Sequence, residues 1–321
     1  MWKPLEAIVD PGRFIRQHGV RGFIVRSATY PVRRLIETRS ARAEQLYYSQ
    51  ALEQEAAKLP QPVDILFYPT RPPPCSYAIT KMTALMGFRM VSEQTPNVRL
   101  AIAWLDETCV DIHPIPGLRC LNSGCRDISK EAVNRTFEVV FGYGFHVDPE
   151  THAGMLVDKA DENFAHDGRI VQGPLVPAPG RVYQRVIDNH VDKRTVMDIR
   201  TPVIGNTIPF VYLKYRPTEN RFGNRNTRVE RCPTQDMFSA EEVSRIISFS
   251  RAMGLDYGEL DILRDRTDGR IYIVDVNKTA SGPPNHLPLS EGRRAMRELG
   301  EVFAQQFLCS TLINQAARQT S

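Results

Sequence analysis

The chain has 321 residues and a net charge of +4, with 24% charged and 42% hydrophobic residues. This composition is typical of a globular protein with two or three lobes, and no apolar run approaches the roughly 20 residues of a membrane-spanning helix. The first 60 residues carry 10 Lys and Arg against 6 Asp and Glu, so the rest of the chain is neutral. The neutrality of residues 61–321 argues against nucleic-acid binding, because nucleic-acid-binding proteins normally carry a broad basic surface. The amino terminus lacks the apolar core of a signal peptide, and we expect a cytoplasmic protein.

A long amphipathic helix is predicted near the amino terminus, over residues 30–59. Its apolar side chains form a rough stripe, and several arginines lie outside that stripe. Three uses of this basic helix stay open: packing on its own domain, docking of a partner protein, and peripheral contact with an anionic membrane surface.

An alternation of strands and helices follows this leader. Strands are predicted over residues 64–68, 89–92 and 100–105, and a helix over residues 78–86. Prolines at residues 69–74 fit a loop between the first strand and this helix. The pattern indicates a small α/β domain that ends near residue 120.

Two lysines stand at the ends of elements in the next segment. Lys130 opens a segment of helical apolar spacing, directly after helix-start residues. Lys159 ends a short strand, and the loop after it contains Gly168. Taken singly, each of these is more often a solvated surface residue, so their order and spacing carry the interpretation.

A further strand ends at the polar residue Gln184 and continues into an extended apolar link from Arg185 to Ile187, which Asp188 follows. Taken alone, this segment fits an ordinary edge strand with alternating exposed polar groups.

Cations then alternate with apolar residues on two predicted strands, at Arg200, Lys214 and Arg216. Guanidinium forks match phosphate and carboxylate oxygens, so these strands suit a cleft that binds a polyphosphate and a carboxylate. The alternative is a basic face exposed to water.

The last motif is a hairpin that carries acidic groups inside apolar strands, over residues 258–264 and 271–277. Side chains alternate between faces, so Asp275 and Asn277 share one face. A three-residue loop at residues 267–269, with glycine in the left-handed position, would set Asp261 opposite Asp275. A two-residue turn would instead pair Asp261 with Val276.

In the first register, two carboxylates and an amide meet at one point. Like charges repel each other unless a cation lies between them, and hard oxygen ligands suit Mg²⁺ or Mn²⁺. Asp261, Asp275 and Asn277 are therefore predicted metal ligands. Arg264, beside them in the sequence, competes with the other cations for a phosphoryl-binding role.

This order of motifs resembles the ATP-grasp superfamily. The hairpin and the following Gly282-Pro283 are similar to the family's carboxy-terminal metal-binding signature, with Asp275 where glutamate is usual. The resemblance implies an α+β ATP-grasp fold, in which two α+β lobes clasp ATP. A small α/β domain with an amino-terminal amphipathic helix would precede them. The implied domains are residues 1–120, 121–190 and 191–321.

The resemblance also assigns roles to the upstream residues. Lys130 and Lys159 are similar to two phosphate-binding lysines, and Gly168 lies in the loop that closes over the phosphates. Gln184, where glutamate is more usual, would face the adenine amine. The backbone from Arg185 to Ile187 would pair with the ring edge, and Asp188 or Asp192 would take the ribose hydroxyls. Charge on the transferred group would be neutralised by Arg200, Lys214, Arg216 and Arg264.

The implied activity is that of an ATP- and Mg²⁺-dependent ligase. ATP would phosphorylate a carboxylate, and an amine or thiol would displace the phosphate, with C–N bond formation as the leading expectation. The expected partners are ATP and small-molecule or peptide carboxylates and amines. A small-molecule kinase and a nucleotide-binding scaffold without turnover are the alternatives, and a homodimer is left open.

Overall fold

The computed structural model describes residues 40–163, 165, 167–223 and 225–308. Contacts within the chain define two compact units, residues 1–50 and 51–321. Residues 40–50 of the first unit and residues 51–56 of the second are helical. The predicted helix over residues 30–59 is thus present from residue 40, while residues 30–39 lie outside the described residues.

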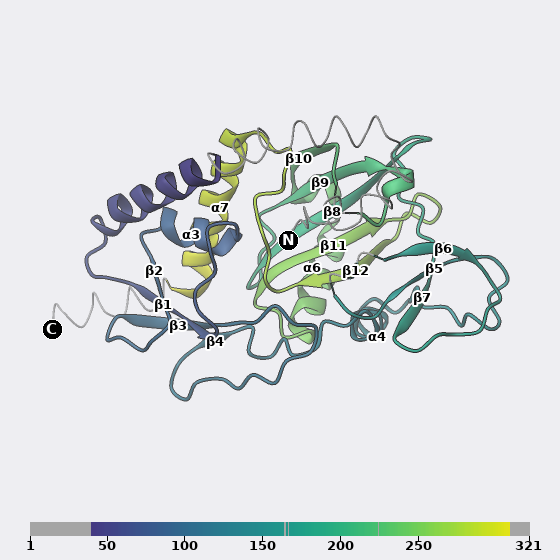
Figure 1. Cartoon of the computed structure of the whole chain (residues 1–321), viewed down its shortest axis with the longest axis horizontal. Helices are drawn as coiled ribbons and strands as arrows, with labels where there is room; N and C mark the ends of the chain where they lie inside the picture. Colours follow the sequence, from purple (N-terminus) through teal and green to yellow (C-terminus); the bar gives the residue numbers. More distant parts are fainter. Residues whose placement is uncertain (1–39, 164, 166, 224, 309–321) are drawn as a thin grey trace, which may run out of the picture. The chain divides into compact units, whose positions relative to one another are not determined.

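A four-stranded parallel sheet opens the second unit (Figure 1). Its strands lie in the order β2-β1-β3-β4. They are β1 (Asp64–Pro69), β2 (Arg89–Val91), β3 (Val98–Trp104) and β4 (Cys120–Leu121). The helix α3 (Ala78–Leu85) connects β1 to β2. Parallel strands are covered on both faces, and β3 is accordingly apolar and almost entirely buried.

The last helix, α7 (Leu289–Phe307), packs on α3 although the two are far apart in the sequence (Figure 1). Gly300 allows the close approach, because a Cβ atom there would lie 2.9 Å from Cγ of Met86. The helix that follows the five-stranded sheet therefore returns to the helix that connects β1 to β2.

A three-stranded antiparallel sheet follows, in the order β6-β5-β7. Its strands are β5 (Met155–Ala160), β6 (Arg169–Gln172) and β7 (Arg181–Arg185). The helix α4 (Lys130–Phe141) precedes it and begins where Ser129 Oγ accepts the Ala132 N–H at 3.2 Å. It ends at Gly142, which has a left-handed φ of 75°. The cap fixes Lys130 at the first position of the helix.

A five-stranded antiparallel sheet has the order β10-β9-β8-β11-β12. Its strands are β8 (Thr195–Ile204), β9 (Phe210–Pro217), β10 (Arg228–Pro233), β11 (Tyr257–Arg264) and β12 (Ile271–Asn277). The short helices η1 (Thr218–Asn220) and α5 (Thr234–Met237) lie in its connections. The longer helix α6 (Ala240–Ala252) begins at a capping box formed by Ser239 and Glu242.

The two faces of this sheet differ in chemistry. One face packs with α4 and α6 into a hydrophobic core, to which it contributes Ile199, Val203, Val211, Leu213, Leu260, Ile262, Ile273 and Val276. Because side chains alternate, the other face carries the polar set Asp198, Arg200, Lys214, Arg216, Glu259, Asp261, Asp275 and Asn277. The core thus fixes the position of every charge on the opposite face.

The mixed α+β class is confirmed. The predicted boundary at residue 120 falls within β4, and the one at residue 190 falls between β7 and β8. The domain division itself stays a prediction. No helix in the described ranges is long and apolar enough to cross a membrane.

Candidate nucleotide and metal site

The acidic hairpin has the expected register at its polar residues. Asp261 lies opposite Asp275, and Glu259 lies opposite Asn277. The alternative pairing of Asp261 with Val276 is therefore wrong. Two carboxylates and an amide share one face of the sheet, as the sequence predicted.

The reason for this register differs from the expected one. Asp265 donates its N–H to the carbonyl of Arg270 at 2.9 Å, so the loop between them has four residues rather than three. That loop alone would pair Asp261 with Val274. A bulge between Asp261 and Ile262 shifts the register by one residue and brings Asp275 opposite Asp261.

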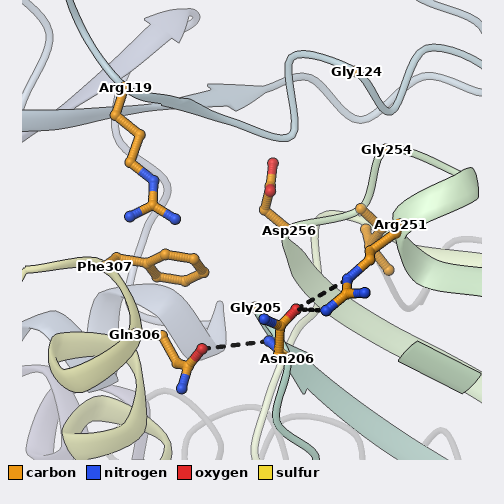
Figure 2. Close-up of a pocket in the computed structure, with 10 residues that line it drawn as sticks. Arg119, Gly124, Gly205, Asn206, Arg251, Gly254, Asp256, Gln306 and Phe307 are labelled. Carbon is orange, nitrogen blue, oxygen red and sulfur yellow. Dashed lines mark hydrogen bonds between the residues drawn. The ribbon is translucent and has the colours of Figure 1, made fainter. Parts of the chain in front are cut away.

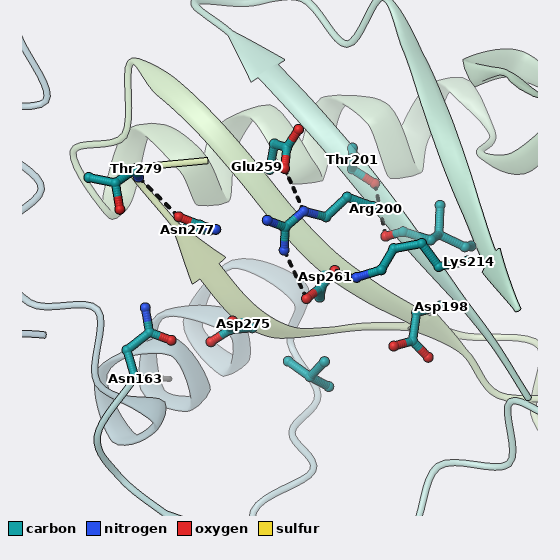
Figure 3. Close-up of polar contacts among 12 residues, drawn as sticks. Asn163, Asp198, Arg200, Thr201, Lys214, Glu259, Asp261, Asp275, Asn277 and Thr279 are labelled. Carbon is teal, nitrogen blue, oxygen red and sulfur yellow. Dashed lines mark hydrogen bonds and ion pairs between the residues drawn. The ribbon is translucent and has the colours of Figure 1, made fainter. Parts of the chain in front are cut away.

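Cations from β8 and β9 neutralise Asp261 (Figure 3). Arg200 on β8 donates to its Oδ2 at 3.0 Å, and Lys214 on β9 donates to its Oδ1 at 3.3 Å. The same guanidinium donates from Nε to Glu259 at 2.5 Å. Burial alone would raise the pKa of Asp261, but the charges of Arg200 and Lys214 hold it below its ordinary value. Asp261 is consequently a fixed anion.

Lys130 reaches Asp275 from the start of α4. Its Nζ lies 2.5 Å from Asp275 Oδ1 and donates to Asn163 Oδ1 at 3.1 Å. Lys159 approaches the same strand from β5 and donates to the carbonyl of Val274 at 3.4 Å. Two lysines from separate elements thus meet at consecutive residues of β12.

The two lysines also act on each other electrostatically. Burial, together with the like charge of Lys130, lowers the pKa of Lys159 to about 8, although Asp275 and Asp261 oppose the shift. Adding negative charge at this point would relieve the repulsion. The protein's own carboxylates thus balance the positive charge of the two lysines only in part, which is the electrostatic property of an anion-binding site.

The predicted metal ligands are hard oxygen donors on one face, which suits Mg²⁺ in chemistry. In this structure Lys130 engages Asp275, and Asn277 Oδ1 accepts the N–H of Thr279 at 3.0 Å. Within the ranges that the structure covers, no three His, Cys, Asp or Glu side chains are grouped to hold a metal ion. The two carboxylates and the amide stay a predicted ligand set.

The predicted adenine hinge is held by internal contacts. Gln184 is buried and donates from Nε2 to Asn134 Oδ1 on α4 at 2.8 Å. The Arg185 N–H donates to the carbonyl of Phe145 at 2.8 Å. The Ile187 carbonyl accepts from Arg221 at 2.8 Å. These bonds fix the path of the hinge.

Two hinge side chains form ion pairs that tie the hinge to the hairpin loop. The Arg185 guanidinium pairs with Asp265 and Asp268 and lies 4.7 Å above the Tyr272 ring. Asp188 pairs with Arg266 at 2.9 Å. The hinge is therefore connected to the loop of the acidic hairpin, away from Asp261 and Asp275.

Contacts within the protein hold the Arg216 side chain in place. Arg216 is buried, pairs with Asp198 at 2.8 Å and donates to the Gly223 carbonyl at 2.5 Å. Burial raises the pKa of Asp198, although Arg216 and Lys214 oppose the shift.

Gly168 lies against the Phe222 ring, since a Cβ there would be 2.7 Å from a ring carbon. The glycine therefore brings the loop after β5 close to the segment after β9.

Arg264 corrects the sequence prediction. Alternation along β11 places it with Leu260 and Ile262, on the face opposite Asp261. Its guanidinium donates to Glu242 at 2.9 Å and 3.0 Å, at the start of α6. Nearness in sequence suggested a phosphoryl-binding role, but the pleat directs the side chain away from the site.

Sequence reasoning assigned no role to three polar residues that contact the predicted site residues. Glu259 and Asp198 pair with Arg200 and Arg216, and Asn163 binds Lys130. Glu259 and Asp198 each stand two residues before a predicted site residue, so the period of a strand would have revealed both. Asn163 belongs to a loop, where no periodicity applies.

A cavity of about 370 Å³ lies elsewhere (Figure 2). Arg119, Arg251, Asp256 and Phe307 are among its lining residues, and Arg251 donates to Asn206 Oδ1 at 2.9 Å. None of the predicted site residues lines it. The chemistry of the charged sheet face is therefore separate from this cavity.

No family model matches the chain, and no curated protein matches it. Solved structures do match. ATP-grasp ligase PsnB, complexed with precursor peptide PsnA2 and AMPPNP, has 17% identity and a TM-score of 0.43, over 60% of this chain and 63% of that chain. The chain thus spans less than two thirds of PsnB.

Two further structures are matched along their full length. The D-alanine–D-alanine ligase from Bacillus anthracis has 11% identity and a TM-score of 0.45, over 79% of this chain and 100% of that chain. The RimK domain protein ATP-grasp from Sphaerobacter thermophilus has 12% identity and a TM-score of 0.44, over 77% and 100%. The roles of the residues rest on this chain's own contacts.

Proposed function

We propose that the chain is an ATP-dependent ligase of the ATP-grasp type, which activates a carboxylate as an acyl phosphate for attack by an amine or thiol. One observation carries the proposal: Lys130 and Lys159 come from separate elements to the same acidic hairpin, 2.5 Å from Asp275 and 3.4 Å from the Val274 carbonyl. A polyphosphate is the ligand that two such ammonium groups suit.

The lowered pKa of Lys159 supports the same ligand. Burial and the neighbouring Lys130 disfavour its charged form. A bound polyphosphate would favour that form and would stabilise both lysines as cations. Ion pairing with Asp275 holds Lys130 ready at the site before any nucleotide is present.

Mg²⁺ would be held by Asp261, Asp275 and Asn277. When bound, it would offset charge on the phosphate oxygens. Lys130 would then exchange its contact with Asp275 for a contact with phosphate. The donor set suits this role because all three residues offer oxygen and share one face of the hairpin.

Arg200, Lys214 and Arg216 would neutralise the transferred phosphoryl group or the acyl phosphate. Glu259 and Asp261 hold the Arg200 guanidinium from two sides, so its orientation is fixed before the substrate arrives. On the adenine side, Gln184, the backbone from Arg185 to Ile187 and Asp188 would bind the base and ribose, and Gly168 would belong to the closing loop. The proposal includes a cytoplasmic location, where ATP is supplied.

Calorimetry tests the nucleotide site. ATP should bind, and Mg²⁺ should strengthen the binding. Lys159→Ala should weaken it about tenfold or more because a charged phosphate contact is lost. Lys58→Ala is the matched control, since Lys58 is exposed and pairs only with Glu55 among the described residues. Unchanged affinity in a folded Lys159→Ala protein would remove that lysine from the site.

The products distinguish the proposed reaction from the other functions. A panel of carboxylates and amines is incubated with ATP and Mg²⁺, and phosphate release is followed together with the mass of the product. A ligase gives ADP, phosphate and an amide or thioester. A phosphorylated product that is stable would instead identify a kinase, and ATP binding without turnover would identify a scaffold.

A further inference from the structure

A pocket of about 330 Å³ lies at the carboxyl ends of β1 and β3. The residues that line it include Arg71, Tyr77, Trp104, Asp106 and Glu107. Trp104, Asp106 and Glu107 were not among the predicted site residues. The pocket thus adds a group of aromatic and acidic side chains to the molecule.

The position of this pocket follows from the topology of the parallel sheet. After β1 the chain passes to β2 on one side, and β3 then lies on the other side of β1. The loops that leave β1 and β3 consequently diverge and leave a crevice between them. Ligands of open parallel sheets bind at such a switch point.

The pocket is joined to the metal hairpin by hydrogen bonds. Thr279 donates from Oγ1 to Asp106 Oδ1 at 2.5 Å, and its N–H donates to Asn277 Oδ1 at 3.0 Å. Tyr77 forms a bridge with Ser281 just beyond. One residue, Thr279, therefore separates a pocket carboxylate from a predicted metal ligand.

The wall of the pocket suits an organic cation. The rings of Tyr77 and Trp104 meet edge to face, with centroids 5.4 Å apart. Asp106 and Glu107 are exposed, and neither forms an ion pair with a described residue. Arg71 is the third charged lining residue, so the lining has a net charge of −1. Aromatic rings and carboxylates without an ion-pair partner are the groups that recognise ammonium and guanidinium ions.

We propose that this pocket binds a positively charged group of the acceptor substrate, an inference that rests on the proposed ligase function. A net negative pocket disfavours the carboxylate substrate. The attacking amine or thiol must be free of its proton, whereas an ammonium between carboxylates keeps its proton. The bound cation is therefore a second group, and the substrate class is an acceptor with one nucleophile and a separate ammonium or guanidinium.

Trp104 provides a direct test. The chain has two tryptophans, Trp2 and Trp104, so a Trp2→Phe background leaves one indole, which lines the pocket. That protein is titrated without ATP with 1,5-diaminopentane, and in parallel with 1,5-pentanediol and glutarate, which match it in length. We expect a saturable change in emission with the diamine alone.

Two variants in the same background identify the carboxylates. Glu107→Gln should weaken diamine binding about fivefold, and the additional change Asp106→Asn should weaken it about tenfold or more. Glu93→Gln changes an exposed acid outside the pocket lining and should leave the affinity unchanged. The proposal is overturned if pentanediol or glutarate binds as tightly as the diamine, if the diamine gives no saturable change, or if the double variant binds it normally.

The titration also keeps this proposal separate from the proposed function. Lys159→Ala should weaken ATP binding as described above and leave the diamine titration unchanged, because Lys159 does not line the pocket. If the wild-type chain does not bind ATP, the proposed ligase function is contradicted. If the chain binds ATP but the diamine does not change the emission of Trp104, only the proposed cation pocket is contradicted.

Discussion

Asp275 has a partner that its sequence context did not reveal. The repulsion expected between Asp261 and Asp275 is offset, because Arg200 and Lys214 neutralise one carboxylate and Lys130 neutralises the other. Each acid is thus balanced even without a metal ion. Removing one of these acids leaves a cation without its counter-charge, which is costly when the cation is largely buried.

Asp275→Asn should therefore lower the free energy of unfolding by about 1 kcal/mol in the absence of Mg²⁺, since the amide keeps a hydrogen bond to Lys130 and loses the charge. Urea denaturation measures this change. ATP-dependent turnover should fall far more steeply, because a predicted ligand of the metal ion loses its negative charge. Asp111→Asn, at an exposed carboxylate, is the control and should change neither quantity. Wild-type turnover in Asp275→Asn would show that this acid is structural.

Lys159 should give the stability of the protein a specific dependence on pH. Its pKa is about 8 in the folded chain against 10.5 for a free lysine, so between these values the unfolded chain binds more protons. The free energy of unfolding should then rise with pH from 8 to 10.5, by up to about 1.4 kcal/mol per pH unit from this group. Below pH 8 both states are protonated and the contribution is constant.

The measurement for Lys159 is a series of urea denaturations between pH 7 and pH 10.5, on the wild-type chain and on Lys159→Met. Subtracting the two curves removes the titration of all other groups. A difference that stays flat through pH 8 would mean that Lys159 is solvated like an ordinary lysine.

At the scale of elements, the strands and helices of the second unit were largely predictable. The expected helix over residues 78–86 is α3 (Ala78–Leu85), and the strand expected over residues 64–68 is β1 (Asp64–Pro69). Periodicity and turn residues are local signals, so a single sequence carries them. The ion pairs of Lys130 and Arg200 join elements far apart in the chain, and no local pattern encodes them.

The hairpin shows where local reasoning reaches its limit. The register at Asp261 was correct, but it results from a bulge together with a four-residue loop. Two compensating one-residue shifts are invisible in a pattern of period two. The error at Arg264 has a related cause, since adjacency to the acids was given more weight than the alternation that turns this side chain to α6.

The loop of this hairpin depends on one glycine. Gly269 has a φ of 72°, and a Cβ atom there would meet nothing within 4 Å. Gly269→Ala should consequently cost only the left-handed backbone strain, about 1 kcal/mol of unfolding free energy. Urea denaturation measures the cost, and calorimetry should show unchanged ATP binding. A loss above about 2 kcal/mol would show that the loop contributes more than its own strain.

At the scale of the whole molecule, a junction of small residues joins the parallel sheet to the five-stranded sheet. Asn122, directly after β4, has a φ of 59° and donates from Nδ2 to the Tyr257 carbonyl at 2.7 Å. Its N–H donates to Asp256 at 2.7 Å. Nearby, the backbones of Gly124 and Gly254 are in direct contact. These contacts connect the segment after β4 to the start of β11.

Gly254→Ala tests this junction against a matched site. Gly254 has a φ of 69°, close to that of Gly269, but a Cβ there would lie 2.3 Å from the carbonyl carbon of Gly124. We expect a loss of roughly 3 kcal/mol or more, the sum of strain and overpacking. Urea denaturation of both variants gives the comparison. Equal losses in the two variants would mean that the contact relaxes without cost.

The return of α7 to α3 has a consequence for the order in which the chain is made. A ribosome releases the parallel sheet early, but the helix that packs on α3 begins at Leu289 and is completed at Phe307. Until then Met82 and Met86, the neighbours of Gly300, lack their cover. The parallel sheet is thus synthesised well before the helix that packs on α3, and the growing chain must keep this apolar surface from other molecules while the residues between β4 and the end of α7 are made.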